Sequence, residues 1–133
     1  MKIDTGNPLE KAVHNYIRRF YPNLGNLPDV QLLKEKDYDS LTSFRTRDAT
    51  YDEQTNSIFF KEIATPTIIC REVHHWAQCQ KLGQQYYETI RNAGSRLMLE
   101  REASIAATEA VYRHRSFTTS FRLLDNRIIE FFK

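Results

Sequence analysis

Several features that mark whole classes of protein are scarce or missing in this chain of 133 residues. No apolar run approaches the roughly 18 residues of a membrane-spanning helix. The formal net charge of +2 is too small to indicate a nucleic-acid-binding surface. The N-terminal sequence is not typical of a signal peptide, and we find no repeat or interdomain linker. We therefore expect one domain over residues 1–133 in the cytoplasm, with neither a membrane nor a nucleic acid as partner.

Cysteine is also scarce, because Cys70 and Cys79 are the only two in the chain. If both lie on one helix, their Cα atoms are ~13 Å apart along its axis, at about 1.5 Å per residue. That separation exceeds the ~7 Å limit for a disulfide between Cα atoms. We therefore predict two reduced cysteines that are buried as small hydrophobic side chains, which fits a reducing compartment.

The N-terminal third of the sequence predicts a helix, a turn and a short strand. Asn7-Pro8 is typical of an N-cap followed by the first helical position. An apolar stripe at i, i+4 spacing then indicates the buried face of that helix: Leu9, Val13, Ile17 and Phe20. Residues 21–28 are rich in turn formers, and residues 30–33 favour a short strand. The polar segment 37–47 gives no clear assignment.

The middle of the chain predicts a hairpin followed by a helix. Strand-forming residues at 49–51 and 57–60 flank a polar turn. Thr65-Pro66 is typical of an N-cap and first helical position, and Gly83 is suited to ending the helix. The core face of this helix is expected to consist of Ile69, Val73 and Trp76.

The remainder of the chain is expected to be helical. Residues 84–92 favour a short helix, and Ser95 is expected to cap a longer helix that ends near His114. A final helix is predicted from Phe121, Leu124, Ile128 and Phe131 or Phe132. This order predicts an α+β fold, in which an N-terminal helix and later helices lie on one face of a short antiparallel sheet with a hairpin.

The most informative motif lies in residues 70–78, which nearly match the His-Glu-x-x-His helix of zinc peptidases. In that pattern two ligands one helical turn apart bind one ion, and a third ligand comes from another helix. A glutamate takes a proton from the metal-bound water. Glu72 and His75 are in register with the glutamate and the second histidine. Arg71 stands where the first histidine is expected, and a guanidinium has no lone pair to offer a metal.

Together with residues 100–104, this segment resembles the minimal gluzincins, which are small zinc metallopeptidases of the zincin type. Their later helix carries Glu-x-x-Ala-Asp or Glu-x-x-Ala-Asn. Here Glu100-Arg101-Glu102-Ala103-Ser104 matches the glutamate and the alanine of that motif. The resemblance runs from the hairpin to roughly Tyr112 and implies a zincin-like fold, with the helix at 66–82 as the active-site-type helix.

The resemblance also implies a role for each matching position: Glu72 as general base, His75 and Glu100 as zinc ligands, Ser104 as support behind the first ligand, and Arg71 and His74 beside the cleft. Because Arg71 and Ser104 both depart from the family, we expect a non-catalytic pseudoenzyme without a cofactor. Its cleft would bind a peptide or protein, with strand 57–60 as the sheet edge. We also expect Arg71 to face Glu100 in place of the ion.

Other interpretations remain open from the sequence. Zinc held through His75 and Glu100 alone would give an active zinc-dependent metallopeptidase with weakened ligation. A different metal set of His75, Cys79 and Glu100 is conceivable, but it has no glutamate placed for base chemistry. In a third interpretation, the motif match is a coincidence. The matching charged residues then form a solvated helix face of a small interaction or regulatory protein that is unrelated to peptidases.

Overall fold

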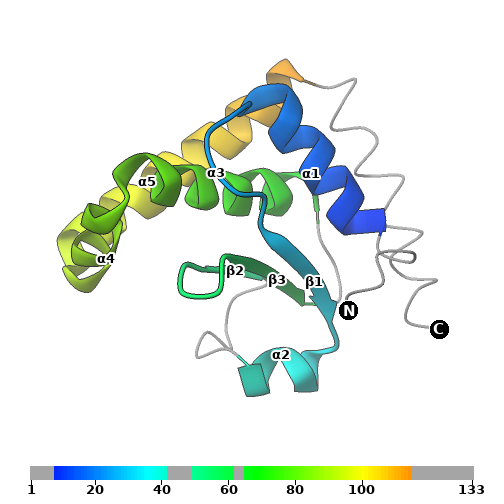
Figure 1. Ribbon diagram of the computed structural model, residues 1–133, viewed down its shortest axis with the longest axis horizontal. Coiled ribbons are helices and arrows are strands. Elements are labelled where there is room, and N and C mark those ends of the chain that lie inside the picture. Colours follow the sequence, from blue (N-terminus) through cyan, green and yellow to red (C-terminus); the bar gives the residue numbers. More distant parts are fainter. Residues whose placement is uncertain (1–7, 42–48, 62–64, 115–133) are drawn as a thin grey trace.

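The computed structural model describes residues 8–41, 49–61 and 65–114 (Figure 1). Its elements in chain order are α1 (Pro8–Phe20), β1 (Asp29–Leu33), α2 (Glu35–Leu41), β2 (Ala49–Asp52), β3 (Ser57–Lys61), α3 (Pro66–Leu82), α4 (Gln84–Arg91) and α5 (Ala93–Arg113). The expected α+β architecture is confirmed at this level, with an N-terminal helix, a small sheet and later helices. The predicted final helix around Phe121 lies outside the described residues.

The strands form one mixed sheet in the order β1-β3-β2. β2 pairs antiparallel with β3 through the predicted hairpin, whereas β1 runs parallel to β3. The prediction of an antiparallel sheet was therefore wrong for β1. The prediction that strand 57–60 forms an edge was also wrong, because β3 is the central strand. Parallel strands need a crossover connection, and here that connection contains α2 and β2.

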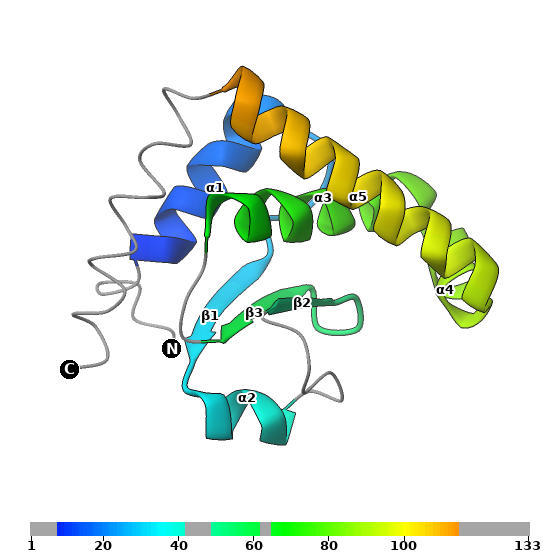
Figure 2. The ribbon, with the colours of Figure 1, turned by 180° about the vertical axis from the view of Figure 1, so that it is seen from behind.

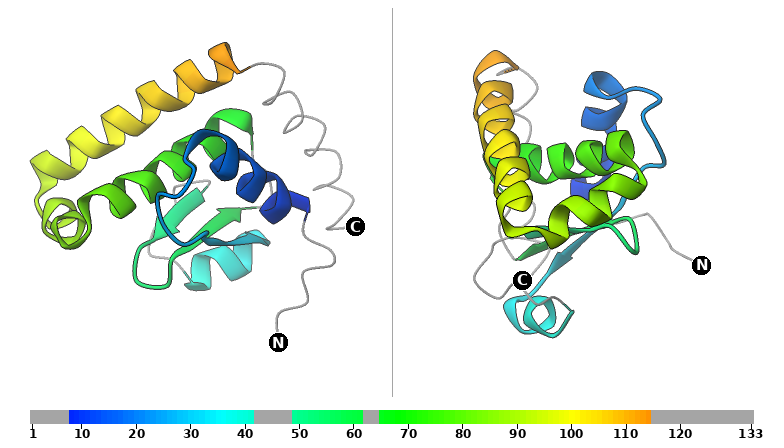
Figure 3. Two further views of the ribbon diagram at one scale, coloured as in Figure 1. Left: turned by 45° about the horizontal axis from the view of Figure 1, so that its top comes forward. Right: turned by 90° about the vertical axis from the view of Figure 1, so that its left-hand side faces the viewer.

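Helices cover both sides of the sheet. α1 and α3 lie on one side, and α2 lies on the other (Figure 1, Figure 3). The expectation that all helices share one face was wrong for α2, which the sequence pattern left unassigned. Tyr38 anchors α2 with a fully buried ring. Lys61 at the end of β3 adds ion pairs, because its Nζ lies 3.3 Å from Glu35 Oε1 and 3.8 Å from Asp39 Oδ1.

The predicted start and end of α3 are confirmed. The hydroxyl of Thr65 accepts a hydrogen bond from the Ile68 amide at 3.3 Å, and Pro66 occupies the first helical position. Gly83 ends the helix with a φ of +59°, a left-handed value that residues with a Cβ adopt with strain. These local signals fix the length of the helix that carries the predicted site.

The N-terminus of α5 differs from the prediction. Asn92, and not Ser95, is the N-cap. Its Oδ1 accepts hydrogen bonds from the Gly94 amide at 3.0 Å and from the Ser95 amide at 3.1 Å. Asparagine and serine are comparable caps, so the sequence alone did not distinguish the two positions.

The core lies between the sheet, α1 and α3. It includes the predicted faces of both helices, with Phe20 at its margin and these residues buried: Leu9, Val13, Ile17, Ile69, Val73 and Trp76. Cys70 and Cys79 are free and buried, as expected. Burial raises the pKa of the Cys70 thiol to about 11, so this thiol stays protonated at neutral pH. No helix in the described ranges is long and apolar enough to cross a membrane.

A buried carboxylate ties α1 to the outer edge of the sheet. Glu10 is only 3% exposed, and its Oε2 accepts a hydrogen bond from the Val30 amide at 2.9 Å. That amide points away from β3, so the bond satisfies a backbone donor on the outer side of β1. The β1 edge is thus engaged by α1, which limits its use for pairing with another strand.

Candidate functional site

Helices α3 and α5 pack along each other (Figure 2). Together these two helices contain all of the predicted site residues. α3 is also covered by α1, α4 and the sheet, so few of its side chains reach solvent. Glu72 and His75 are consequently only 2% and 7% exposed. Burial of ionisable groups is costly unless they have partners, so their contacts decide what this region can do.

His75 and Glu100 connect the two helices. The distance from His75 Nε2 to Glu100 Oε2 is 3.3 Å. The contact is not aligned as a hydrogen bond, and it is an ion pair when the His75 ring is protonated. Glu100 is partly exposed, with 30% of its side-chain area open to solvent. The structure therefore brings these two predicted site residues together across the α3–α5 interface.

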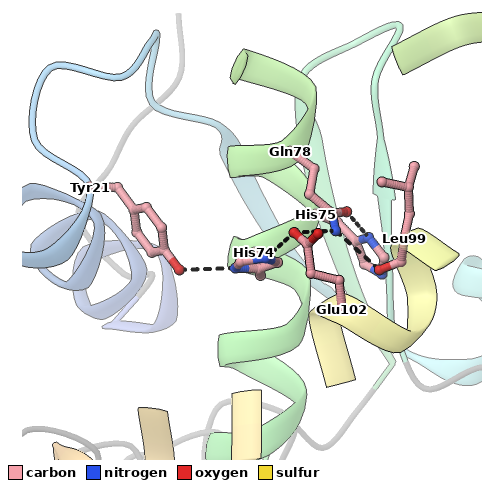
Figure 4. A network of polar contacts seen from close by, with 6 residues as sticks. All are labelled: Tyr21, His74, His75, Gln78, Leu99 and Glu102. Carbon is pink, nitrogen blue, oxygen red and sulfur yellow. Dashed lines mark hydrogen bonds and ion pairs between the residues drawn. The ribbon is translucent and has the colours of Figure 1, made fainter. Parts of the chain in front are cut away.

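Gln78 fixes the ring of His75 (Figure 4). Its Nε2 donates to the Leu99 carbonyl at 3.0 Å and to Glu102 Oε1 at 3.2 Å. Its Oε1 therefore faces His75 Nδ1, at 2.9 Å. An amide oxygen can only accept, so Nδ1 carries the proton of the neutral ring. In the neutral ring, Nε2 presents a lone pair towards the Glu100 carboxylate, and the two repel each other. A second proton, on Nε2, would make this contact attractive.

The pKa of His75 is raised above its ordinary value of 6.5. Burial is the largest single influence and lowers the pKa, because it disfavours the charged ring. The contact with Glu100, the nearby Glu72 carboxylate and the hydrogen bond to Gln78 together outweigh burial. The surroundings of His75 therefore favour the charged ring more than water does, and a second proton on the ring would lie on Nε2, facing Glu100.

His74 forms a second bridge, which connects α3 both to α5 and to the residue after α1. Its Nε2 lies 2.9 Å from Glu102 Oε1, and its Nδ1 lies 3.1 Å from the Tyr21 hydroxyl (Figure 4). The carboxylate accepts, so Nε2 carries a proton, and in the neutral ring the Tyr21 hydroxyl donates to Nδ1. His74 and then Gln78 lower the pKa of Glu102 through their hydrogen bonds. Burial raises the pKa of Tyr21, so this hydroxyl is a structural donor rather than a nucleophile.

Arg71 pairs with its neighbour Glu72. The distance from Arg71 Nε to Glu72 Oε1 is 3.8 Å, and 30% of the Arg71 side chain is exposed. The expectation that Arg71 bridges to Glu100 was wrong, because His75 makes that contact instead. Adjacent helix residues point apart, but the long arginine side chain can turn back along the helix surface to its neighbour.

Ser104 and Cys79 do not join the His75–Glu100 contact. Ser104 is exposed on α5, and its carbonyl accepts a hydrogen bond from Thr108 Oγ1 at 3.0 Å. Within residues 8–41, 49–61 and 65–114, no three His, Cys, Asp or Glu side chains gather closely enough to hold a metal ion. The alternative set with Cys79 is therefore not assembled. A catalytic zinc site takes three protein ligands, and among the described residues His75 and Glu100 supply two of the predicted ligand positions.

Sequence reasoning missed three contributors to this network. Gln78 is three positions after His75 on the same helix, so its spacing was a signal that we did not use. Glu102 stands at an unspecified position of the Glu-x-x-Ala motif, and no role was predicted for it. Tyr21 is separated from His74 by much of the chain, and only the fold brings the two together.

No protein-family model matches this chain, and no curated protein or solved structure matches it either. The likeness to the minimal gluzincins therefore stays a prediction that rests on the motif residues. Function has to be argued from the chemistry of the site, since a general α+β architecture hosts many unrelated functions.

Proposed function

We propose that this chain is a degenerate zincin-like domain that does not cleave peptides and that binds a peptide or protein segment beside the α3–α5 contact. The observation that carries the proposal is the 3.3 Å separation of His75 Nε2 and Glu100 Oε2. These residues occupy the second and third ligand positions of the resemblance. They come from separate helices, as that arrangement requires.

The length of the His75–Glu100 contact supports the zincin-like register. Two ligand atoms at about 2.0–2.1 Å from a tetrahedral zinc ion lie about 3.3–3.4 Å apart. The two side chains are thus at ligand-to-ligand spacing. Gln78 holds the other ring nitrogen, as a supporting group does at zinc-bound histidines. The raised pKa of His75 supports a role for its proton in neutralising Glu100 in place of an ion.

Position 71 argues against peptidase activity. Arg71 brings a positive charge to the helical turn before His75 and offers no lone pair to an ion. Glu72 acts on a metal-bound water only where an ion is held. The alternative, an active zinc-dependent metallopeptidase, would use His75 and Glu100 as ligands and Glu72 as base. It would need zinc to bind tightly without a ligand from position 71.

The partner class follows from the sheet edges. β1 is engaged by Glu10 on its outer side, so β2 is the edge strand that remains for an extended peptide. α3 packs against β2, so a peptide added there would lie next to the helix that carries His75. Addition of a strand to a sheet edge is a common mode of peptide binding.

Zinc binding tests the register of the site. The parent protein and the double variant Arg71→His/Ser104→Asp are compared by calorimetry after dialysis against a chelator. We expect weak or no binding by the parent and at least about tenfold tighter binding by the double variant, which regains a ligand and its support. Arg91→His, an exposed change on α4, is the matched control and should bind like the parent.

Each result has a defined meaning. Near-stoichiometric zinc in the parent, with peptide cleavage that a chelator stops, would establish the active metallopeptidase instead. No gain in the double variant, with its circular dichroism unchanged, would contradict the zincin-like register and favour an unrelated interaction protein.

Peptide binding tests the proposed surface. Peptides selected from a random displayed library should shift the amide NMR signals of β2 and α3. Shifts confined to other elements would contradict the proposed binding surface.

A further inference from the structure

The outward face of α5 collects the large exposed hydrophobic side chains of the described residues. Met98 is 73% exposed, Tyr112 71%, Leu97 59% and Ile105 56%, and all four belong to α5. The opposite face packs on α3 through Ala103 and Ala107, which are buried. α5 runs along the outside of the described molecule (Figure 3). Exposed apolar side chains gathered on one face indicate an interaction surface.

The spacing of these side chains makes one stripe. Met98, Ile105 and Tyr112 follow each other at seven-residue intervals. A straight helix drifts by about 20° per seven residues, so the three side chains fall within about 40° of one another. From Met98 to Tyr112 the stripe is about 21 Å long, at about 1.5 Å per residue. This length is sufficient for contact along another helix.

The stripe is symmetric about Ile105. Met98 and Tyr112 lie seven positions before and after it, and Arg101 and Glu109 lie four positions before and after it. Arg101 and Glu109 are both exposed. Two antiparallel copies centred on Ile105 would therefore place Met98 against Tyr112 of the partner subunit. The same arrangement would place Arg101 against Glu109 of the partner subunit, with opposite charges in contact.

We propose that this stripe is a homodimer interface, in which α5 packs antiparallel against α5 of a second copy about a two-fold axis at Ile105. A two-fold interface uses the same patch twice and must be complementary to itself, which this arrangement of apolar and charged residues is. A parallel pair would place Arg101 against Arg101 of the partner subunit and is disfavoured. The surface faces away from His75 and Glu100, so this proposal does not depend on the proposed function.

The area of one helix face predicts a weak dimer. Interfaces at the low end of the size range, below about 1,200 Å² in total, belong mostly to weak and transient complexes. We therefore expect a monomer–dimer equilibrium in the micromolar range or above. Sedimentation velocity of the full chain from about 10 μM to about 1 mM should show the average mass rise towards that of a dimer. A parent that stays monomeric throughout overturns the proposal.

Ile105→Glu tests the centre of the stripe. Because Ile105 faces its own copy, one substitution places two carboxylates together, and we expect dimerisation to be lost across the concentration range. Gln85→Glu on α4 adds the same charge at another exposed position and should dimerise like the parent. Circular dichroism checks that both variants fold. A dimer that survives Ile105→Glu uses another surface and overturns the proposal.

A charge exchange tests the antiparallel register. Arg101→Glu places two glutamates in contact at each end of the interface, and Glu109→Arg places two arginines there. Each single variant should dimerise more weakly than the parent, by roughly 2- to 30-fold for two symmetric contacts. An equimolar mixture of the two variants restores opposite charges at both contacts and should associate better than either variant alone. A mixture that associates no better than its components refutes this register.

Discussion

The two faces of α5 show opposite relations between polarity and burial. On the inner face, Ala103 and Ala107 are buried, and Glu100 reaches His75 across the interface. On the outer face, the larger apolar side chains of Met98 and Ile105 are exposed. Small residues let α3 and α5 approach closely, and polar side chains from both helices fill the remaining space. On this helix, the buried side chains are therefore the small ones and those with a polar partner on α3, and not the most hydrophobic ones.

A larger side chain on the inner face should produce the largest effect on stability. Ala107 is 1% exposed against α3, so Ala107→Leu has no space for the added atoms. We expect a loss of up to about 3 kcal/mol in the free energy of unfolding. Ser104→Leu adds the same side chain at an exposed position of α5 and should change it by less than about 0.5 kcal/mol. Urea denaturation at low protein concentration measures both, and equal effects would break the contrast between the faces.

Removal of the amide that joins the polar groups should have a smaller effect. Gln78→Leu keeps the approximate volume but leaves His75 Nδ1 and the Leu99 carbonyl without this partner. Gln78 is 4% exposed, so we expect a loss of about 1–2 kcal/mol. Gln85→Leu, at an exposed position of α4, is the control in the same denaturation experiment. If both variants are as stable as the parent, the network contributes nothing to the α3–α5 interface.

The pH dependence of the His75–Glu100 pair should be the smallest effect. The pKa of His75 is raised in the folded protein, so its contribution to stability is fully present below the unfolded value of about 6.5. That contribution is lost as the pH rises through the higher pKa of the folded state. Glu100→Gln should bring the pKa of His75 down and flatten this part of the stability profile. NMR titration of the ring protons measures the pKa directly.

A titration result in the other direction would be informative. If the ring of His75 titrates below 6.5 in the parent, burial outweighs the carboxylates, and the ring is neutral at its contact with Glu100. The lone pair of His75 Nε2 and the Glu100 carboxylate would then repel each other, and a group other than a proton would have to offset that repulsion. His74, which bonds to Glu102 rather than Glu100, provides an internal comparison in the same spectra.

The sequence predicted much of the fold where local signals are strong. The cap at Thr65, the glycine after α3 and the apolar stripe of α1 each set an element by short-range geometry. The hairpin was predictable for the same reason, since a short polar turn forces antiparallel pairing of β2 and β3. The parallel position of β1 was not predictable, because its partner is reached only through a crossover.

The candidate site was predictable in part. The motif spacing selected His75 and Glu100, which the structure places in contact. The motif spacing gave the wrong partner for Arg71, which pairs with Glu72. Charge alone did not show that His75, and not Arg71, would contact Glu100. The motif spacing also missed Gln78, whose role depends on a hydrogen bond to the Leu99 carbonyl on another helix.

The sequence by itself determined where α3 begins and ends, which faces of α1 and α3 are apolar, and which residue types the site contains. These properties depend on neighbours within a few positions along the chain. Only the tertiary structure decided that β3 is central, that Tyr21 reaches His74, and that the apolar stripe of α5 faces outward. Each of these depends on how distant elements share a limited interior. Close packing of the interior selects one arrangement of helices and strands among several that local sequence signals do not distinguish.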